Sequence, residues 1–187
     1  MVKTITNCNV IFKRTIEMSV LLCKHFGKHG LAFPTPSDLS GVSIQTLMKK
    51  ANVGYRADRI LRLAKAFHSG ELSERFFDDP AIPTAEVHRK ILSLHGFGVF
   101  ATSNVLQLLG RYDTEVEAWD TETVRLMKEL RVRATTTEGF RAAARGRYEP
   151  YRPYQFLAYW FELWLNYEKR AGSLSTRWTA GTFQVAL

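Results

Sequence analysis

Two glycines one residue apart, Gly96 and Gly98, stand between two segments whose apolar residues recur at helical spacing. The first segment runs from Thr84 to Leu94, and the second runs from Phe100 to Leu109, where Gly110 ends it. A pair of glycines lets the backbone turn sharply, and Gly98 comes just before the second helix begins. The sequence therefore predicts a helix, a tight hairpin and a helix in succession.

The rest of the chain shows the same helical periodicity, and no segment alternates apolar and polar residues as a half-buried strand would. We expect further helices over residues 5–26, 44–51, 60–67, 121–130, 137–145 and 153–170. Ser37, which follows a proline turn, is expected to cap another short helix. The predicted fold class is all-α, a helix bundle that contains a helix-hairpin-helix motif.

A length of 187 residues suits one domain, which we expect to cover residues 1–170. Residues 171–187 show no clear period, and we expect them to form an irregular tail. No apolar stretch has the length of a signal peptide or of a membrane span. The sequence therefore predicts neither secretion nor insertion into a membrane.

The net charge indicates the class of binding partner, and the number of cysteines excludes several kinds of disulfide and metal site. The 26 Lys and Arg residues exceed the 18 Asp and Glu residues, so the formal net charge is +8 at pH 7. Such an excess attracts polyanions, nucleic acid first and anionic membranes second, although a basic surface without such a partner is the alternative. Cys8 and Cys23 are too few for a disulfide framework, a four-Cys zinc site or a four-Cys iron–sulfur cluster, and they favour a reducing compartment.

The hairpin has the chemistry to bind a nucleic-acid backbone. Its residues are Leu94, His95, Gly96, Phe97 and Gly98. Glycines let backbone N–H groups approach a phosphate, and the positive end of the next helix adds attraction for an anion. Such contacts hold DNA without reading its sequence. The same glycines also suit a hairpin that only packs two helices together, so both interpretations are open at this point.

The residues that follow make the pattern more specific. After Gly96-Phe97-Gly98-Val99-Phe100-Ala101, Asp120 comes about twenty residues later, just before a predicted helix. This arrangement resembles the helix-hairpin-helix DNA glycosylases, whose signature is Leu-x-Gly-x-Gly, a helix and then an aspartate before another helix. We therefore expect the fold and the activity of that family.

Other motifs extend the resemblance to roughly residues 3–168. Three upstream motifs fall in the order that the oxidised-guanine branch of the family shows: Asn7-Cys8-Asn9, Phe33-Pro34-Thr35-Pro36 and Gly54-Tyr55-Arg56-Ala57. Downstream, Tyr151-Arg152-Pro153-Tyr154 before an aromatic-rich segment resembles the last core helix of the family. The combination is more specific than any one of these motifs.

The resemblance implies that Asp120 is the catalytic carboxylate. Breaking an N-glycosidic bond builds positive charge on the sugar, and a carboxylate stabilises that charge and can orient or deprotonate a water. Asp120 also suits the N-cap of the helix that starts at Thr121, and the two roles are compatible. Trp119, its neighbour, is expected to line the base pocket.

Many members of the family carry a nucleophilic lysine at the position that Phe100 occupies here. The resemblance therefore implies a monofunctional enzyme, which releases the base and leaves an abasic site. Phe100 is expected to stack on the extruded base, with an ordinary core aromatic as the alternative.

The resemblance also assigns residues to the gap that a flipped base leaves. Tyr55 would intercalate, Arg56 would hydrogen-bond the orphaned base, and Asn9 would help to fill the gap. Packing at a helix turn is the alternative for Tyr55, and a helix cap or a surface amide is the alternative for Asn9. Arg59, Arg62 and Lys65 are expected to neutralise phosphates or to form a solvated face.

The predicted function is base-excision repair by a monomer that binds double-stranded DNA containing a damaged base. It needs no organic cofactor, and the resemblance alone implies a monovalent cation at the carbonyls of residues 94–98. The sequence starts inside what would be the first core helix of the family, so we expect a shortened member. Because it has no cysteine cluster, we expect it to fall outside the iron–sulfur branch. It would work in a nucleus or in a bacterial cytoplasm and nucleoid. The alternatives are a non-catalytic DNA-binding module and a structural or protein-interaction domain.

Overall fold

The computed structural model describes residues 1–112 and 120–171. The chain divides into two compact units, Met1–Val105 and Leu106–Leu187. Every regular element within the described residues is a helix, which confirms the all-α prediction. None of these described helices is long and apolar enough to cross a bilayer. The prediction of one domain over 1–170 stays a prediction, and residues 172–187 of the expected tail lie outside the described part.

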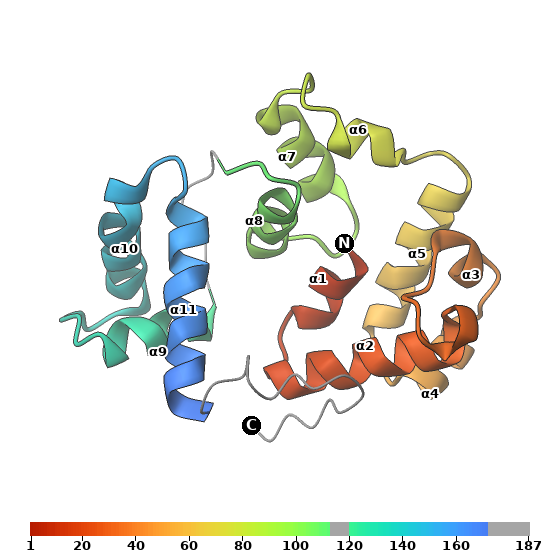
Figure 1. The fold of residues 1–187 in the computed structure, drawn as a ribbon, viewed down its shortest axis with the longest axis horizontal. Coiled ribbons are helices and arrows are strands. Elements are labelled where there is room, and N and C mark those ends of the chain that lie inside the picture. Colours follow the sequence, from red (N-terminus) through yellow and green to blue (C-terminus); the bar gives the residue numbers. More distant parts are fainter. Residues whose placement is uncertain (113–119, 172–187) are drawn as a thin grey trace. The chain divides into compact units, whose positions relative to one another are not determined.

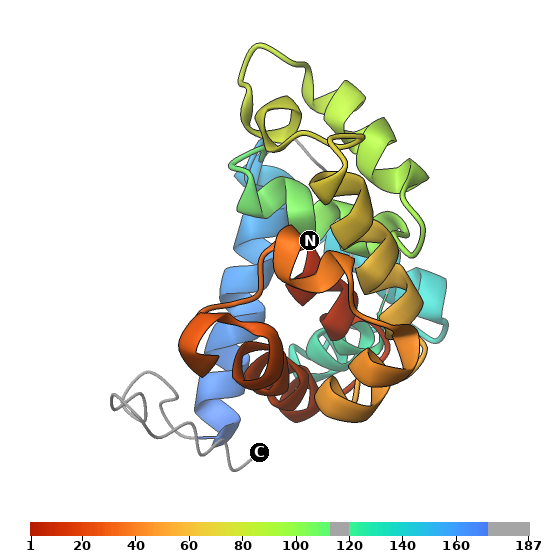
Figure 2. The ribbon, with the colours of Figure 1, turned by 90° about the vertical axis from the view of Figure 1, so that its right-hand side faces the viewer.

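The first unit is built around a central helix, α5. Its elements are α1 (Val2–Asn7), α2 (Phe12–Phe26), the 3-10 turn η1 (Lys28–Gly30), α3 (Pro36–Ser40), α4 (Ile44–Ala51), α5 (Arg56–His68), α6 (Glu74–Asp78), α7 (Thr84–Ser93) and α8 (Val99–Leu108), which continues into the second unit. Helix α5 packs against α1, α3 and α4, and α2 packs against α1 and α4 (Figure 1 and Figure 2). Ile5, Leu22, Leu47 and Ile60 are completely buried between these helices. Each such side chain stabilises the unit by about 1.5–3 kcal/mol.

The second unit places α10 against both of its helical neighbours (Figure 1). Its described elements are α9 (Thr121–Glu129), α10 (Thr137–Tyr148), the 3-10 turn η2 (Glu149–Tyr151) and α11 (Gln155–Ala171). The core is aromatic: Phe156 and Tyr159 of α11 stack with ring centroids 5.9 Å apart, and Tyr148 of α10 meets Tyr159 edge-on at 5.7 Å. These rings fix α11 against α10.

The predicted helix over 5–26 is wrong in one respect, because it is broken into α1 and α2. Asn9 lies at the break with φ of 54°, in the left-handed region that asparagine tolerates better than most residues. The guanidinium of Arg56 donates to the carbonyl oxygens of Cys8 and Asn9 there. It therefore satisfies backbone groups that have left the helical pattern.

The predicted cap at Ser37 is also wrong, because Thr35 caps α3. The N–H of Asp38 donates to Thr35 Oγ1 over 3.3 Å, and the N–H of Thr35 donates to Asp38 Oδ2 over 2.8 Å. This reciprocal pair is a capping box. The structure also adds α6, a five-residue helix that the sequence analysis did not predict.

Candidate functional site

The hairpin of residues 94–98 connects α7 to α8, as predicted. The N–H of Phe97 donates to the carbonyl of Leu94 over 3.1 Å and closes the turn. The side chain of Phe97 is buried and anchors the hairpin in the core of the first unit. The carbonyl of Gly98 accepts the N–H of Thr102 over 2.9 Å, so α8 begins directly after the second glycine.

The two glycines of the hairpin meet different constraints. Gly96 has φ of +94°, and a Cβ on it would lie 2.4 Å from Cδ of Arg59. A side chain at residue 96 would therefore be strained and would displace Arg59. Gly98 is exposed, and a Cβ on it would meet nothing within 4 Å. Among the residues that the structure describes, nothing close to Gly98 requires a glycine there, which leaves room for the close approach of an outside group.

Tyr55 lies at the start of α5 and presents its ring to solvent, with 54% of its surface exposed. The guanidinium carbons of Arg56 and Arg59 lie 4.5 Å and 4.9 Å from the ring centroid. These cation–π contacts hold the ring in place in basic surroundings. Because Arg59 contacts both Tyr55 and the hairpin at Gly96, the structure brings the predicted intercalating residue and the predicted backbone-binding hairpin together.

Arg56 also contacts Asn9, through a hydrogen bond to its backbone carbonyl that the sequence did not indicate. Only 6% of Arg56 is exposed, and its guanidinium donates to the carbonyls of Cys8 and Asn9. The structure thus places Arg56 as an internal brace of the α1–α2 break. Asn9 is exposed at that break. Contact of either residue with an orphaned base stays a prediction.

His95 is held over α5 by an acidic side chain. Asp58 Oδ2 lies 3.4 Å from Nε2 of His95 and accepts a hydrogen bond from Nε of Arg62 over 2.8 Å. Arg59 of α5 contacts the hairpin and the exposed ring of Tyr55, the N-cap of α5, and Arg62 shares Asp58 with His95 of the hairpin. Exposed cations and an aromatic ring are the groups that contact phosphates and bases.

In the second unit, Asp120 is the N-cap of α9, as its sequence position indicates. Its Oδ1 accepts two hydrogen bonds from Thr123, one from the backbone N–H over 3.0 Å and one from the hydroxyl over 2.9 Å. The positive end of the helix dipole adds stabilisation for a negative charge at this position. The carboxyl group is consequently fixed in direction.

Burial raises the pKa of the Asp120 carboxyl above its ordinary value. The two hydrogen bonds from Thr123 oppose that rise, and the negative charge of Glu122 adds to it. The Asp120 carboxyl group is thus partly buried and accepts hydrogen bonds from the N–H and the hydroxyl of Thr123. Such a group is suited to stabilise positive charge that develops beside it.

Tyr159 of α11 supports this arrangement from the core, and the sequence analysis did not identify it. Its hydroxyl lies 3.1 Å from Oγ1 of Thr123.

Gln155 lies one turn before Tyr159 on α11 and is buried, and its Oε1 has no hydrogen-bond partner among the residues that the structure describes. An unpaired buried amide oxygen is available to a bound ligand. A polar residue at the start of an aromatic-rich helix was the only sequence signal for it.

The remaining predicted site residues are only partly placed. Phe100 lies half-buried in the first turn of α8, and its carbonyl accepts a hydrogen bond from Nδ2 of Asn104 over 2.7 Å. Helix α8 carries no lysine. Trp119 lies outside the described residues. Phe100 belongs to the first unit and Asp120 to the second.

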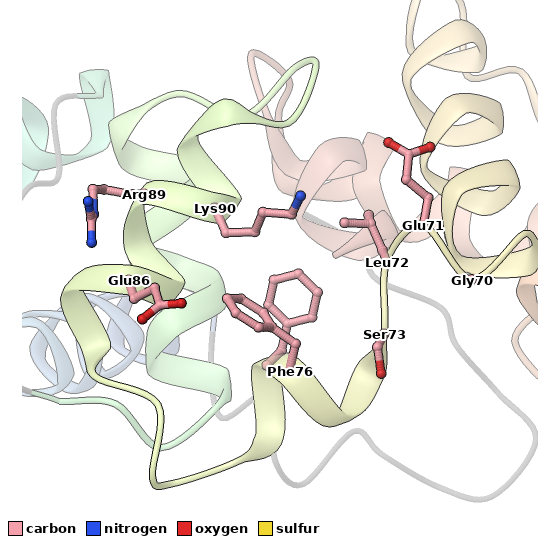
Figure 3. Close-up of a pocket in the computed structure, with 9 residues that line it drawn as sticks. Gly70, Glu71, Leu72, Ser73, Phe76, Glu86, Arg89 and Lys90 are labelled. Carbon is pink, nitrogen blue, oxygen red and sulfur yellow. The ribbon is translucent and has the colours of Figure 1, made fainter.

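A hollow of about 670 Å³ lies elsewhere in the first unit, between the α5–α6 connection, α6 and α7. Figure 3 shows Lys90 reaching across Phe76 toward Leu72, while Arg89 points away. None of the predicted site residues lines this hollow. Over residues 1–112 and 120–171, no cluster of three His, Cys, Asp or Glu side chains is arranged to hold a metal ion.

Comparisons with known proteins agree with the fold. No protein-family model matches the sequence, and no curated protein sequence matches it. MBOgg1 in complex with a low-affinity DNA ligand matches with a TM-score of 0.73 and 22% identity, over 90% of this chain and 59% of that chain.

Clostridium acetobutylicum 8-oxoguanine glycosylase/lyase matches in two structures. In complex with double-stranded DNA containing cytosine opposite 8-oxoG, it gives a TM-score of 0.71 at 16% identity, over 90% of this chain and 58% of that chain. The apo form gives 0.66 at 17% identity, over 88% and 57%. At these identities the likeness establishes the fold, that of the all-α helix-hairpin-helix DNA glycosylases, and this chain spans less than three fifths of those proteins.

Proposed function

We propose that this chain is a DNA glycosylase of base excision repair, which flips a damaged base out of duplex DNA and hydrolyses its N-glycosidic bond. The observation that carries the proposal is Asp120, a partly buried carboxylate directed by Thr123 at the N-terminus of α9. It occupies the position that the family signature reserves for the catalytic aspartate, in a chain with the fold of solved DNA glycosylases.

The first unit supplies the DNA-binding surface in this proposal. The N–H that follows Gly98 binds a phosphate oxygen, since Gly98 carries no side chain to obstruct the approach. Tyr55 enters the base stack at the gap, held by Arg56 and Arg59. The net charge of +8 supports attraction to the DNA backbone.

The carbonyls of residues 94–98 are the oxygen type that binds a monovalent cation. Those of Leu94 and Gly98 each accept one N–H, from Phe97 and Thr102, and each keeps a second lone pair. The residues present therefore fit such an ion, which would add positive charge where the hairpin meets a phosphate.

The chemical step uses Asp120 in its ionised form. The bond between the sugar C1′ and the base nitrogen breaks, its electron pair leaves with the base, and positive charge develops on the sugar. The carboxylate stabilises that charge and directs a water to C1′, and the proton of the water neutralises the departing base. Because Phe100 stands at the lysine position and α8 has no lysine, we propose that no Schiff base forms and that the product is an intact abasic strand.

Oxidised guanine is the first substrate to test, since the similar Clostridium acetobutylicum protein is an 8-oxoguanine glycosylase/lyase. The experiment is single-turnover excision on duplexes that carry oxidised, alkylated or deaminated bases, read with and without alkali. We expect strand cleavage that needs alkali and that is lost in Asp120→Asn. Nicking without alkali would overturn the monofunctional assignment. Salt-sensitive binding without base release would instead indicate a non-catalytic DNA-binding module.

A further inference from the structure

Asp120 is the first member of a chain of hydroxyl groups that runs into the core of the second unit. Oγ1 of Thr123 donates to Oδ1 of Asp120 over 2.9 Å and lies 3.1 Å from the hydroxyl of Tyr159. A threonine hydroxyl has one proton, and here that proton is directed to the carboxylate. The hydroxyl of Tyr159 must therefore donate to Thr123.

Both supporting groups are shielded from water. Thr123 and Tyr159 are completely buried. Burial raises the pKa of Tyr159 far above its ordinary value, and the nearby charge of Asp120 adds to the rise. The phenol therefore stays neutral and remains a donor over the whole working range of pH. Two aromatic neighbours, Tyr148 and Phe156, fix its ring.

We infer that Thr123 and Tyr159 are positioning residues that orient the Asp120 carboxylate and favour its ionised form. The inference rests on the proposed function of Asp120 as the catalytic carboxylate. Neither residue touches the DNA in this account, and both act through Oδ1. The polarity of the chain, from phenol to hydroxyl to carboxylate, delivers two donors of Thr123 to one oxygen and sets the direction of the other.

The groups that face Asp120 define what its titration reports. The acidic neighbour on its own helix is Glu122, which raises the pKa of Asp120. From α11 the facing group is the neutral phenol of Tyr159, whose hydroxyl lies 3.1 Å from Oγ1 of Thr123. Removing the Thr123 hydroxyl takes away a donor to the ionised form without changing any charge. The pKa of Asp120 should then rise.

The test compares Thr123→Val, Thr123→Ser and Tyr159→Phe in the full chain. Thr123→Val keeps the shape and the backbone N–H but removes the hydroxyl, and Thr123→Ser restores the hydroxyl. Tyr148→Phe is the matched control, because it removes a neighbouring buried phenol that donates to Glu162 and not to Thr123. Thermal unfolding of each variant checks that the fold is retained.

The first measurement is the pKa of Asp120, followed by carboxyl carbon NMR and assigned with Asp120→Asn. We expect a higher pKa in Thr123→Val, a smaller rise in Tyr159→Phe, and values close to wild type in Thr123→Ser and Tyr148→Phe. An unchanged pKa in Thr123→Val would overturn the inference, whatever the activity of the protein.

The second measurement is the pH profile of single-turnover excision. At neutral pH we expect the rate of Thr123→Val to fall roughly ten- to a hundredfold, with its acidic limb moved to higher pH and restored in Thr123→Ser. A change of pKa without base release by any variant, wild type included, would mean that the proposed function fails while the hydrogen-bond chain stands. Normal excision by Thr123→Val at every pH would contradict a positioning role.

Discussion

Arg59 lies across the backbone of Gly96, with its Cδ 2.4 Å from the place where a side chain at residue 96 would begin. The same guanidinium lies 4.9 Å from the ring centroid of Tyr55. One side chain of α5 thus fixes the geometry of the hairpin and of the exposed aromatic ring together. If the hairpin binds phosphate and Tyr55 intercalates, as we propose, Arg59 couples the two contacts.

Gly96→Ala is expected to destabilise the first unit by about 1–3 kcal/mol, because alanine is strained at this φ. Displacement of Arg59 from Tyr55 should also weaken DNA binding. Gly98→Ala is the matched control for stability, since no atom of residues 1–112 or 120–171 lies within 4 Å of its Cβ position. We expect Gly98→Ala to keep its stability in urea denaturation and to lose affinity for duplex DNA. Full affinity for duplex DNA in Gly98→Ala would argue against phosphate binding at the N–H that follows Gly98.

Tyr55→Ala is expected to slow base excision by roughly tenfold or more, because an intercalated ring no longer supports the flipped state. The ring is more than half exposed, so the free energy of unfolding should change by no more than about 0.5–1 kcal/mol. Tyr55→Phe keeps the ring and should keep most of the rate. Single-turnover kinetics together with denaturation separate the two effects, and an undiminished rate in Tyr55→Ala would remove Tyr55 from the site.

Asp120→Asn is expected to stabilise the fold at pH 7 while it abolishes excision. Burial raises the pKa of Asp120 in the folded chain above the unfolded value, so the folded state binds more protons between these two values. Stability therefore falls as pH rises through that interval, and an uncharged cap escapes the loss. In urea denaturation, the gain in stability of Asp120→Asn over the wild type should shrink as the pH approaches 4, near the ordinary pKa of aspartate.

Asp38→Asn provides the control of opposite sign. Hydrogen bonds from the backbone N–H and the hydroxyl of Thr35 lower the pKa of Asp38. Its contribution to stability is present above the unfolded pKa and is lost as the pH falls. Asp38→Asn should therefore reduce stability at pH 7, measured by the same urea denaturation. Equal effects of the two substitutions at pH 7 would contradict the account of Asp120.

Binding to duplex DNA is expected to weaken steeply with salt, with a slope in log affinity against log salt of about −0.9 for each phosphate neutralised. Arg62→Ala should make that slope shallower by about one, because its exposed guanidinium lies on α5 beside the hairpin. Tyr55→Ala should leave the slope unchanged, since the phenol carries no charge. A slope that no substitution on α5 alters would place the phosphate contacts elsewhere.

Helical periodicity and local capping were enough to predict much of this fold. The helix over Ile44–Ala51 and the cap at Asp120 follow from residues close in sequence, and the structure confirms both. The break at Asn9 could not be predicted, because it depends on the guanidinium of Arg56, which lies far along the chain. The apolar pattern continues through the break, so periodicity gives no sign of it.

In the candidate site, as in the fold, features that depend on residues close in sequence could be predicted, and contacts between distant segments could not. Motif spacing predicted the hairpin turn and placed Asp120 before a helix, and the structure confirms both positions, whereas the catalytic role of Asp120 stays a proposal. The contact of Arg59 with Gly96 joins two distant segments, and neither segment shows a sequence sign of it. Thr123 and Tyr159 come from different helices, and only the packing of the second unit brings their hydroxyls together. Supporting groups of this kind are visible only in three dimensions.

We propose above all that Asp120 catalyses the release of a damaged base. The most direct measurement is the amount of free base released from each damaged duplex under single turnover, detected by mass spectrometry for wild type and Asp120→Asn. We predict release by the wild type from one class of duplex and a rate at least about a hundredfold lower in Asp120→Asn, with DNA binding retained. Equal release by the two proteins, or no release from any duplex that the wild type binds, would contradict the account.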